Sequence, residues 1–229
     1  MSKKNETHKD QFENVENALS KTEHYIEENQ KSLTIIVVAI IIIVGGYLGY
    51  KRFVETPMET ESKTQMWMAE QYFAKDSFNL ALNGDGNDLG FLDIIEEYSI
   101  TKSANLANYY SGISYLRLGQ FENAIEHLKQ FESDDKMVAP IAYGAIGDAY
   151  MELDNFDDAL VFYNKAVNTS ENNFTTPIYL MKISVVQKQN GDYKKALETY
   201  KKIEKNFPNT PEGRQISKYI AQVEVLIQD

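Results

Sequence analysis

The sequence predicts an all-α protein: a single N-terminal transmembrane helix, then a solenoid of stacked helix pairs, then a C-terminal capping helix. Two observations carry this prediction. Residues 33–50 form an uncharged apolar run, and three later segments repeat the same small and aromatic residues at intervals of 35 and 37 residues. A third observation, the absence of cysteine, excludes disulfides, thiolate catalysis and cysteine-ligated metals.

The apolar run is long enough to cross a bilayer. A helix rises about 1.5 Å per residue and the hydrocarbon layer is about 30 Å thick, so about 17 to 25 apolar residues are needed. Eleven residues between Leu33 and Leu48 are Leu, Ile or Val, and each favours insertion by roughly 0.3 to 0.6 kcal/mol at mid-bilayer. A buried core helix would usually keep a polar stripe, and a cleaved signal peptide would not be followed by Lys51 and Arg52. We therefore expect a retained signal anchor that contacts the lipid bilayer at 33–50.

The span separates a polar tail, residues 1–32, from one soluble domain, residues 53–229. Four apolar residues of the tail have helical spacing, so the tail is either a short amphipathic helix or unstructured. The net charge of the chain is −11, and the soluble domain carries the excess of acidic residues. Such a domain neutralises phosphate poorly, so nucleic acid is not an expected partner. The four apolar residues of the tail that have helical spacing are Phe12, Val15, Leu19 and Ile26.

The repeated segments are predicted to be pairs of antiparallel helices. Each has a small residue in its first helix, a turn residue, an aromatic residue, an alanine, and a large residue in its second helix. The small residues and alanines let helices approach closely, and the aromatic residues fill the space between units. The pattern resembles the tetratricopeptide repeat, a helix pair of about 34 residues. The positions are Gly112, Gly119, Phe121, Ala124 and Leu128; Gly147, Asp154, Phe156, Ala159 and Tyr163; and Ser184, Gly191, Tyr193, Ala196 and Tyr200.

This pattern places repeats at about 105–138, 140–173 and 177–210. Pro208 and Pro211 then break the chain before a capping helix at about 211–228. A divergent first repeat is expected at about 60–100, with helices at 65–82 and 89–99. The residues expected to bury one face of the capping helix are Ile216, Ile220, Val223 and Ile227.

Residues that could carry catalysis are few. The three histidines, His8, His24 and His127, are scattered along the chain, and there is no H-E-x-x-H, G-x-S-x-G or phosphate-binding loop. Acidic pairs are expected to be solvated helix faces. We therefore expect no enzyme activity, no catalytic residues and no cofactor.

The loop at 85–96 is the one candidate for a metal. Gly90 and Glu96 occupy the sixth and twelfth places of an EF-hand loop, but Leu89 stands where an oxygen ligand belongs. The alternative is an ordinary turn in which Asp88 caps the following helix. We favour the turn and expect no metal site, although the sequence leaves calcium binding open.

The tetratricopeptide resemblance implies a concave groove, lined by the first helix of each pair at its second, fifth, ninth and twelfth places. Most of these residues are apolar, and methionine suits an adaptable surface, so we expect the groove to bind a peptide or a partner helix. The alternative, that several of them pack one repeat against the next, stays open. Some domains of this family grip a C-terminal carboxylate through Lys and Asn in the leading unit, but Tyr109 and Ile113 stand at those places. The expected groove residues are Leu106, Tyr109, Ile113 and Leu116; Ile141, Gly144, Asp148 and Met151; and Ile178, Met181, Val185 and Lys188.

The order of tail, anchor, divergent helix pair, three repeats and closing helix resembles the YfgM-like ancillary subunits of the bacterial SecYEG translocon. The phrases ALNGDG, GFLDIIEEY, GAIGDAY and TTPIYLMK are typical of such proteins in the Bacteroidota. The resemblance implies a cytoplasmic tail, periplasmic repeats, and two partners: the SecYEG translocon and a membrane-anchored periplasmic chaperone.

Charge alone does not decide the orientation, since two basic residues precede the span closely and three follow it. The family arrangement places the protein in the inner membrane with its repeats in the periplasm. The function we expect is a non-catalytic, membrane-anchored interaction module that holds a partner or an emerging polypeptide near the translocation channel. The alternative is a scaffold for assembly of cell-envelope or cell-division machinery.

Overall fold

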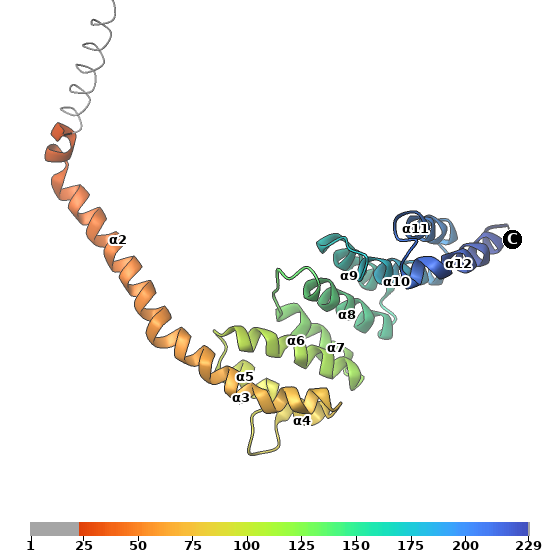
Figure 1. Cartoon of the computed structure of the whole chain (residues 1–229), viewed down its shortest axis with the longest axis horizontal. Helices are drawn as coiled ribbons and strands as arrows, with labels where there is room; N and C mark the ends of the chain where they lie inside the picture. The colour runs from red at the N-terminus through yellow and green to blue at the C-terminus, as the bar shows by residue number, and fades with distance from the viewer. Residues whose placement is uncertain (1–22, 229) are drawn as a thin grey trace, which may run out of the picture. The chain divides into compact units, whose positions relative to one another are not determined.

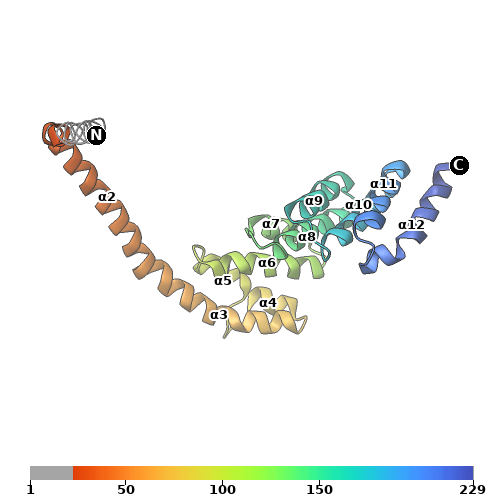
Figure 2. The same ribbon diagram turned by 45° about the horizontal axis from the view of Figure 1, so that its top comes forward.

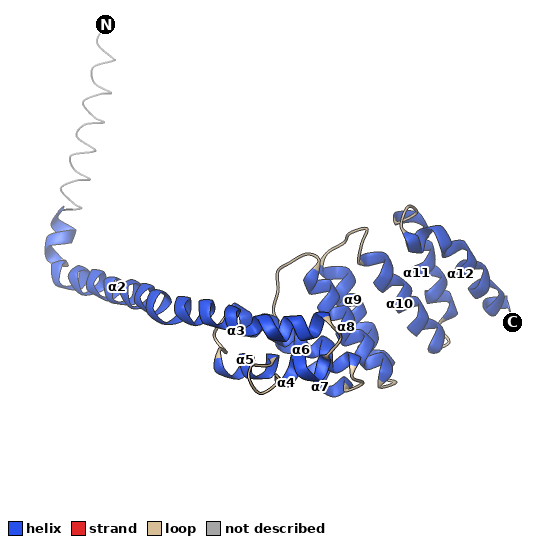
Figure 3. Ribbon diagram, turned by 60° about the horizontal axis from the view of Figure 1, so that its bottom comes forward, coloured by secondary structure: helices blue, strands red, loops and turns tan. Residues whose placement is uncertain are grey.

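The computed structural model describes residues 23–228, and every regular element in that range is helical, which confirms the all-α prediction (Figure 3). The helices divide into two units, one ending at Pro57 and one beginning at Met58. The tail residues Phe12, Val15 and Leu19 lie outside the described range. The helices are α2 (Gln30–Tyr50), η1 (Lys51–Glu55), α3 (Thr56–Ala74), α4 (Phe78–Asn83), α5 (Phe91–Glu97), α6 (Lys102–Arg117), α7 (Phe121–Gln130), α8 (Val138–Glu152), α9 (Phe156–Thr169), α10 (Thr176–Gln189), α11 (Tyr193–Asn206) and α12 (Pro211–Gln228).

The first unit contains the apolar helix. α2 has 21 residues, none of them buried by any other described residue, and Ile43 is 70% exposed. A helix of this length rises about 30 Å, which matches the hydrocarbon layer. Because leaving so much apolar surface in water is unfavourable, α2 is a candidate membrane span by both length and composition.

A turn of π-helix, η1, follows the apolar run directly. The Lys51 carbonyl accepts both the Thr56 backbone N–H and, at 2.8 Å, the Thr56 hydroxyl at this irregular turn. Exposed Tyr50 and Phe53 flank the two basic residues there. Aromatic and basic side chains together suit the boundary between hydrocarbon and head groups.

The divergent first repeat differs from the prediction. The expected single helix at 65–82 is wrong, because α3 ends at Ala74 and α4 begins at Phe78. Asp76 between them has a φ of 54°, in the left-handed region, and Asp and Ser compete with helix hydrogen bonding through their side chains. The second helix is also shorter than the predicted 89–99, since α5 covers only Phe91–Glu97.

Close approach of the paired helices is confirmed at two of the three predicted small residues, Gly112 and Gly147. A Cβ added to Gly112 would lie 2.4 Å from the Cγ of Leu128, and one added to Gly147 would lie 2.6 Å from the ring of Tyr163. The alanines at the predicted second-helix positions are fully buried. Successive helices from α6 to α11 consequently pack on one another in the second unit (Figure 1). These alanines are Ala124, Ala159 and Ala196.

The predicted turn residues have the left-handed conformation that stops each first helix. The φ angles are 73° at Gly119, 55° at Asp154 and 75° at Gly191. Asp tolerates this region better than most residues with a Cβ, which explains why the second repeat turns without glycine.

The closing helix α12 covers the last repeat, as the sequence predicts. It contacts α10 and α11, and Figure 2 shows it beside α11. Ile216 and Val223 are fully buried, whereas Ile220 and Ile227 are partly buried against the same cluster. The apolar edge that an uncapped solenoid would expose is therefore covered.

We predict that Ala159→Leu destabilises the solenoid. Ala159 is 0% exposed, so a larger side chain would overpack the contact between helices at a cost of about 1 to 3 kcal/mol. Thermal melts of the full chain in detergent micelles, followed by circular dichroism, would show a fall of roughly 2 to 4 °C per kcal/mol. Ala221→Leu on the exposed face of α12 is the matched control. Equal melting temperatures for the two variants would contradict the packing described here.

Candidate functional site

The predicted groove residues on α6 are half-buried rather than open. Leu106 packs against the cluster formed by α3 to α6, and Tyr109, Ile113 and Leu116 pack against the cluster of α7 and α8. The Tyr109 ring centroid lies 5.2 Å from that of Phe131, and burial raises the pKa of the Tyr109 hydroxyl. On this helix the expected groove residues also support packing between repeats.

On α8, one of the expected groove positions serves a different purpose. Gly144 is buried, and a Cβ there would lie 2.0 Å from the ring of Tyr179 on α10. Gly144 therefore admits the tyrosine that joins two repeats, and its expected place on the groove surface is wrong. Met151 packs against the cluster of α9 to α12, and Ile141 is half-exposed.

The apolar residues on α10 are the most exposed of the predicted set. Ile178 is 36% exposed and Val185 is 43% exposed. Met181 between them is partly buried, and the spacing places all three on one side of the helix. Phe174 adjoins them just before α10 and is 68% exposed. We call the exposed residues Phe174, Ile178 and Val185 the α10 face. Lys188, in the last turn of α10, is half-exposed.

The loop before α10 fixes Phe174, which the sequence analysis missed. The Asn172 carboxamide oxygen accepts the backbone N–H groups of Phe174 and Thr175, each at 2.8 Å. The Asn172 amide nitrogen donates to the Thr175 hydroxyl at 2.8 Å and to the Ser170 carbonyl at 3.1 Å. These bonds fix the backbone at Phe174, so the loop needs little further ordering when a partner covers the exposed ring. The signal available in sequence was the Asn-x-Phe-Thr turn, in which asparagine commonly bonds its own backbone.

Asp148 connects three helices instead of projecting freely into the groove. The same carboxylate oxygen, Oδ1, accepts two hydrogen bonds, one from the Tyr163 hydroxyl at 2.7 Å and one from the Lys182 ammonium. Burial, followed by the charge of Asp148, raises the pKa of both Tyr163 and Tyr179, whose rings stack at 6.2 Å. These contacts join α8, α9 and α10, so Asp148 stabilises the junction between the second and third repeats.

The loop at 85–96 folds around its own aspartate. Asp85 accepts the backbone N–H groups of Asn87 and Asp88, both at 2.9 Å, and the Tyr72 hydroxyl at 2.8 Å. The prediction that Asp88 caps α5 is wrong, because Asp93 accepts the N–H of the cap residue Gly90 at 2.9 Å. Within residues 23–228, no group of three His, Cys, Asp or Glu side chains is placed to hold a metal.

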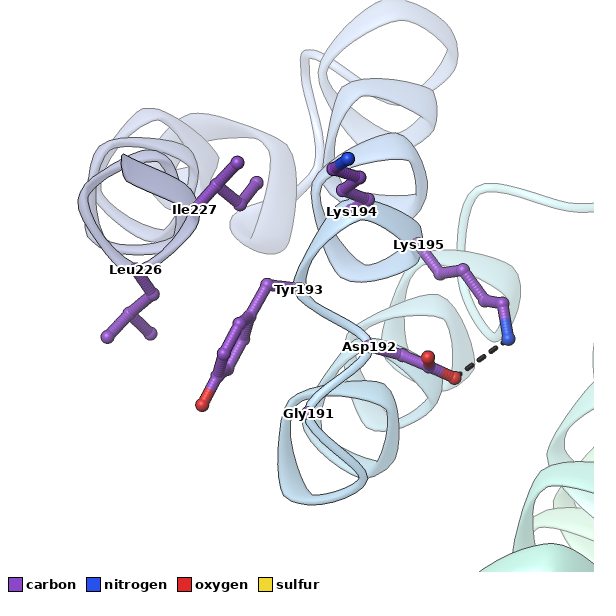
Figure 4. Close-up of a pocket in the computed structure, with 7 residues that line it drawn as sticks. All are labelled: Gly191, Asp192, Tyr193, Lys194, Lys195, Leu226 and Ile227. Atoms are coloured by element: carbon purple, nitrogen blue, oxygen red, sulfur yellow. Dashed lines mark hydrogen bonds and ion pairs between the residues drawn. The ribbon is translucent and has the colours of Figure 1, made fainter. Parts of the chain in front are cut away.

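A separate hollow of about 430 Å³ lies where the α10–α11 turn meets the end of α12. Figure 4 shows the Tyr193 ring beside Leu226, while Asp192 points away and pairs with Lys195 at 2.7 Å. The lining combines the apolar side chains of Leu226 and Ile227 with the Tyr193 phenol and the charged side chains of Asp192, Lys194 and Lys195.

We predict that Asp148→Ala loosens the junction between the second and third repeats. The change leaves the Tyr163 hydroxyl and the Lys182 ammonium without their acceptor, at a cost of about 1 kcal/mol after allowing for partial exposure. Urea unfolding of the full chain would measure it. Asp148→Asn, which keeps an oxygen acceptor, should lose less. Glu224→Ala removes only an exposed ion pair with Lys201 at 3.6 Å, so its effect on the free energy of unfolding should be near zero. If Glu224→Ala lost as much stability as Asp148→Ala, the stabilising role assigned to Asp148 would be wrong.

Comparisons with known proteins agree with this geometry. Residues 110–173 and residues 179–210 each match a tetratricopeptide repeat family. A solved structure described as the crystal structure of MamA protein superposes with a TM-score of 0.56 at 18% identity, covering 72% of this chain and 83% of that one. This identity supports the fold alone, and no curated protein matches the chain. Within the second unit, residues 110–173 and 179–210 therefore form a solenoid of tetratricopeptide repeats, and they follow a helix with the length and composition of a membrane span.

Proposed function

We propose that the chain is a non-catalytic, membrane-anchored module that binds a protein partner on the α10 face. The observation that carries the proposal is the exposure of three apolar side chains, Phe174, Ile178 and Val185, within and just before a single helix, α10. Clustered exposed apolar side chains on a soluble domain mark interaction sites, and tetratricopeptide repeats are typically interaction modules. The matched families indicate no enzyme.

The partner we propose is a polypeptide near the Sec translocation channel, or a periplasmic chaperone that acts there. The support is the resemblance in element order and sequence phrases to the ancillary translocon subunits. In this arrangement residues 33–50 cross the inner membrane, the tail is cytoplasmic and the repeats are periplasmic. Anchoring raises the effective concentration of the repeats beside other membrane proteins, so the α10 face needs only modest intrinsic affinity.

A photocrosslinking residue at position 185 tests the proposal in native membranes. Val185 on the α10 face and Val161 on α9 are both valines, 43% and 58% exposed, so position 161 is a matched control. Mass spectrometry should find channel subunits or periplasmic folding factors crosslinked at 185 and not at 161.

Other outcomes would change the proposal in defined ways. Crosslinks at 185 to cell-envelope or cell-division proteins, without channel subunits, would replace the translocon role with that of an assembly scaffold. Equal yields of the same products at positions 185 and 161 would remove the α10 face as the binding surface.

A further inference from the structure

A second cleft, separate from the α10 face, lies between α7, the α7–α8 loop, α8 and α9. It encloses about 580 Å³ and includes none of the predicted groove residues. Leu128 and Ile146 lie at its base and are almost fully buried. Phe131 and Phe162 add aromatic walls. The cleft has room for an apolar side chain and its neighbours in an extended peptide.

Two lysines stand over the aromatic rings of this cleft. The Lys129 ammonium donates to the Tyr150 hydroxyl at 2.8 Å and lies 5.4 Å from the Phe162 ring centroid. The Lys165 ammonium lies 5.6 Å from the same centroid and 4.8 Å from that of Tyr143. The aromatic faces attract both ammonium groups and so limit their positions.

Neither ammonium lies within ion-pair distance of a carboxylate, because the ion pairs found among residues 23–228 all involve other side chains. The cleft is lined by these two lysines and, on its loop side, by Glu132 and Asp134. The lining charges therefore balance, but both ammonium groups keep donors available at the cleft. An anionic group bound there gains charge-assisted hydrogen bonds from ammonium groups whose positions are already restricted.

The loop that forms one side of the cleft is also fixed in place. The Asn105 side chain donates to the Glu132 carbonyl at 2.8 Å and accepts the Glu132 N–H at 2.9 Å. Phe131 is held against Tyr109. The cleft is thus largely formed before a ligand arrives, which lowers the cost of binding.

We infer that this cleft binds the side-chain carboxylate of an extended peptide that has a neighbouring aromatic residue. The carboxylate would lie between Lys129 and Lys165, and the aromatic ring would pack against the half-buried Phe131 and Phe162. Glu132 and Asp134 line the loop side, and their charges repel a dianionic phosphate more than a singly charged carboxylate. The inference gives the second unit a second peptide site, with a charge preference that the α10 face lacks.

The test uses the full chain in detergent micelles and fluorescein-labelled peptide amides. The probe is Gly-Ser-Phe-Glu-Phe-Ser-Gly, with versions that carry Gln or phosphoserine in place of Glu and a free-acid version of the Gln peptide. Fluorescence anisotropy should show the Glu peptide binding about five- to tenfold more tightly than the Gln amide. It should also bind more tightly than the phosphoserine peptide. The free-acid peptide distinguishes a terminal carboxylate from a side-chain one.

Variants link the preference to the two lysines. Lys129→Gln with Lys165→Gln should abolish the difference between Glu and Gln peptides, and Lys129→Arg with Lys165→Arg should retain most of it. Lys202→Gln with Lys205→Gln on exposed positions of α11 makes the same change of net charge and should alter nothing. Circular dichroism melts would verify that each variant is folded.

Four results would overturn the inference. These are equal affinity for the Glu and Gln amides, a preference that survives in the Lys129/Lys165 glutamine variant, tighter binding of phosphoserine, and a gain confined to the free-acid peptide. None of them depends on the identity of the partner at the α10 face, so this site and the proposed function can fail independently.

Discussion

The solenoid depends on one steric condition, a residue with no side chain or a very small one where the two helices of a repeat cross, namely Gly112, Gly147 and Ser184. At Gly112 and Gly147 any Cβ would overlap Leu128 or Tyr163 of the second helix. The large residue on one helix fills the space left by the small residue on the other, and this close contact brings buried alanines such as Ala159 together. Each pair then presents an apolar side to the next pair, so the core extends along the repeats and ends where α12 covers it.

This dependence explains what could be read from the sequence. Small residues, turn residues and buried alanines recur at fixed spacing because each satisfies a local steric requirement. The three repeats, their turns and the closing helix were therefore predictable. The turn requirement does not depend on glycine alone, since Asp154 stands at a turn position and still has a φ of 55°. The first unit's apolar helix was predictable for a different reason, because length and hydropathy alone define a candidate span.

The remaining features depend on tertiary contacts that no local pattern specifies. The break at Asp76 interrupts a segment with good helical spacing. Gly144 leaves room for the Tyr179 ring of another repeat, although its position in the family pattern predicts a groove residue. Phe174 lies outside the repeat's first-helix positions, and its exposure follows from the bonded turn around Asn172. Sequence spacing identifies which helices face the groove. The exposure of each groove side chain depends on how the neighbouring repeat packs against its helix.

The groove positions therefore fall into two groups with different consequences for function. Tyr109 and Ile113 on α6, and Met181 on α10, are packed against core clusters, so replacing them would change stability together with any binding. Ile178 and Val185 are exposed, so a partner can use them at little cost to the fold. The lysine and aromatic cleft between α7 and α9, proposed above as a second peptide site, is built from other residues.

The central claim is that the α10 face is a partner surface and not part of the core. The most direct measurement compares the variant Ile178→Ser with Val185→Ser against the unmodified chain, by thermal melting and by crosslinked partner yield in native membranes. Because both side chains are more than a third exposed, we expect a melting temperature within about 2 °C of the unmodified chain and loss of most of the crosslinked product. A large fall in melting temperature, or an unchanged crosslinked yield in a stable variant, would contradict the account.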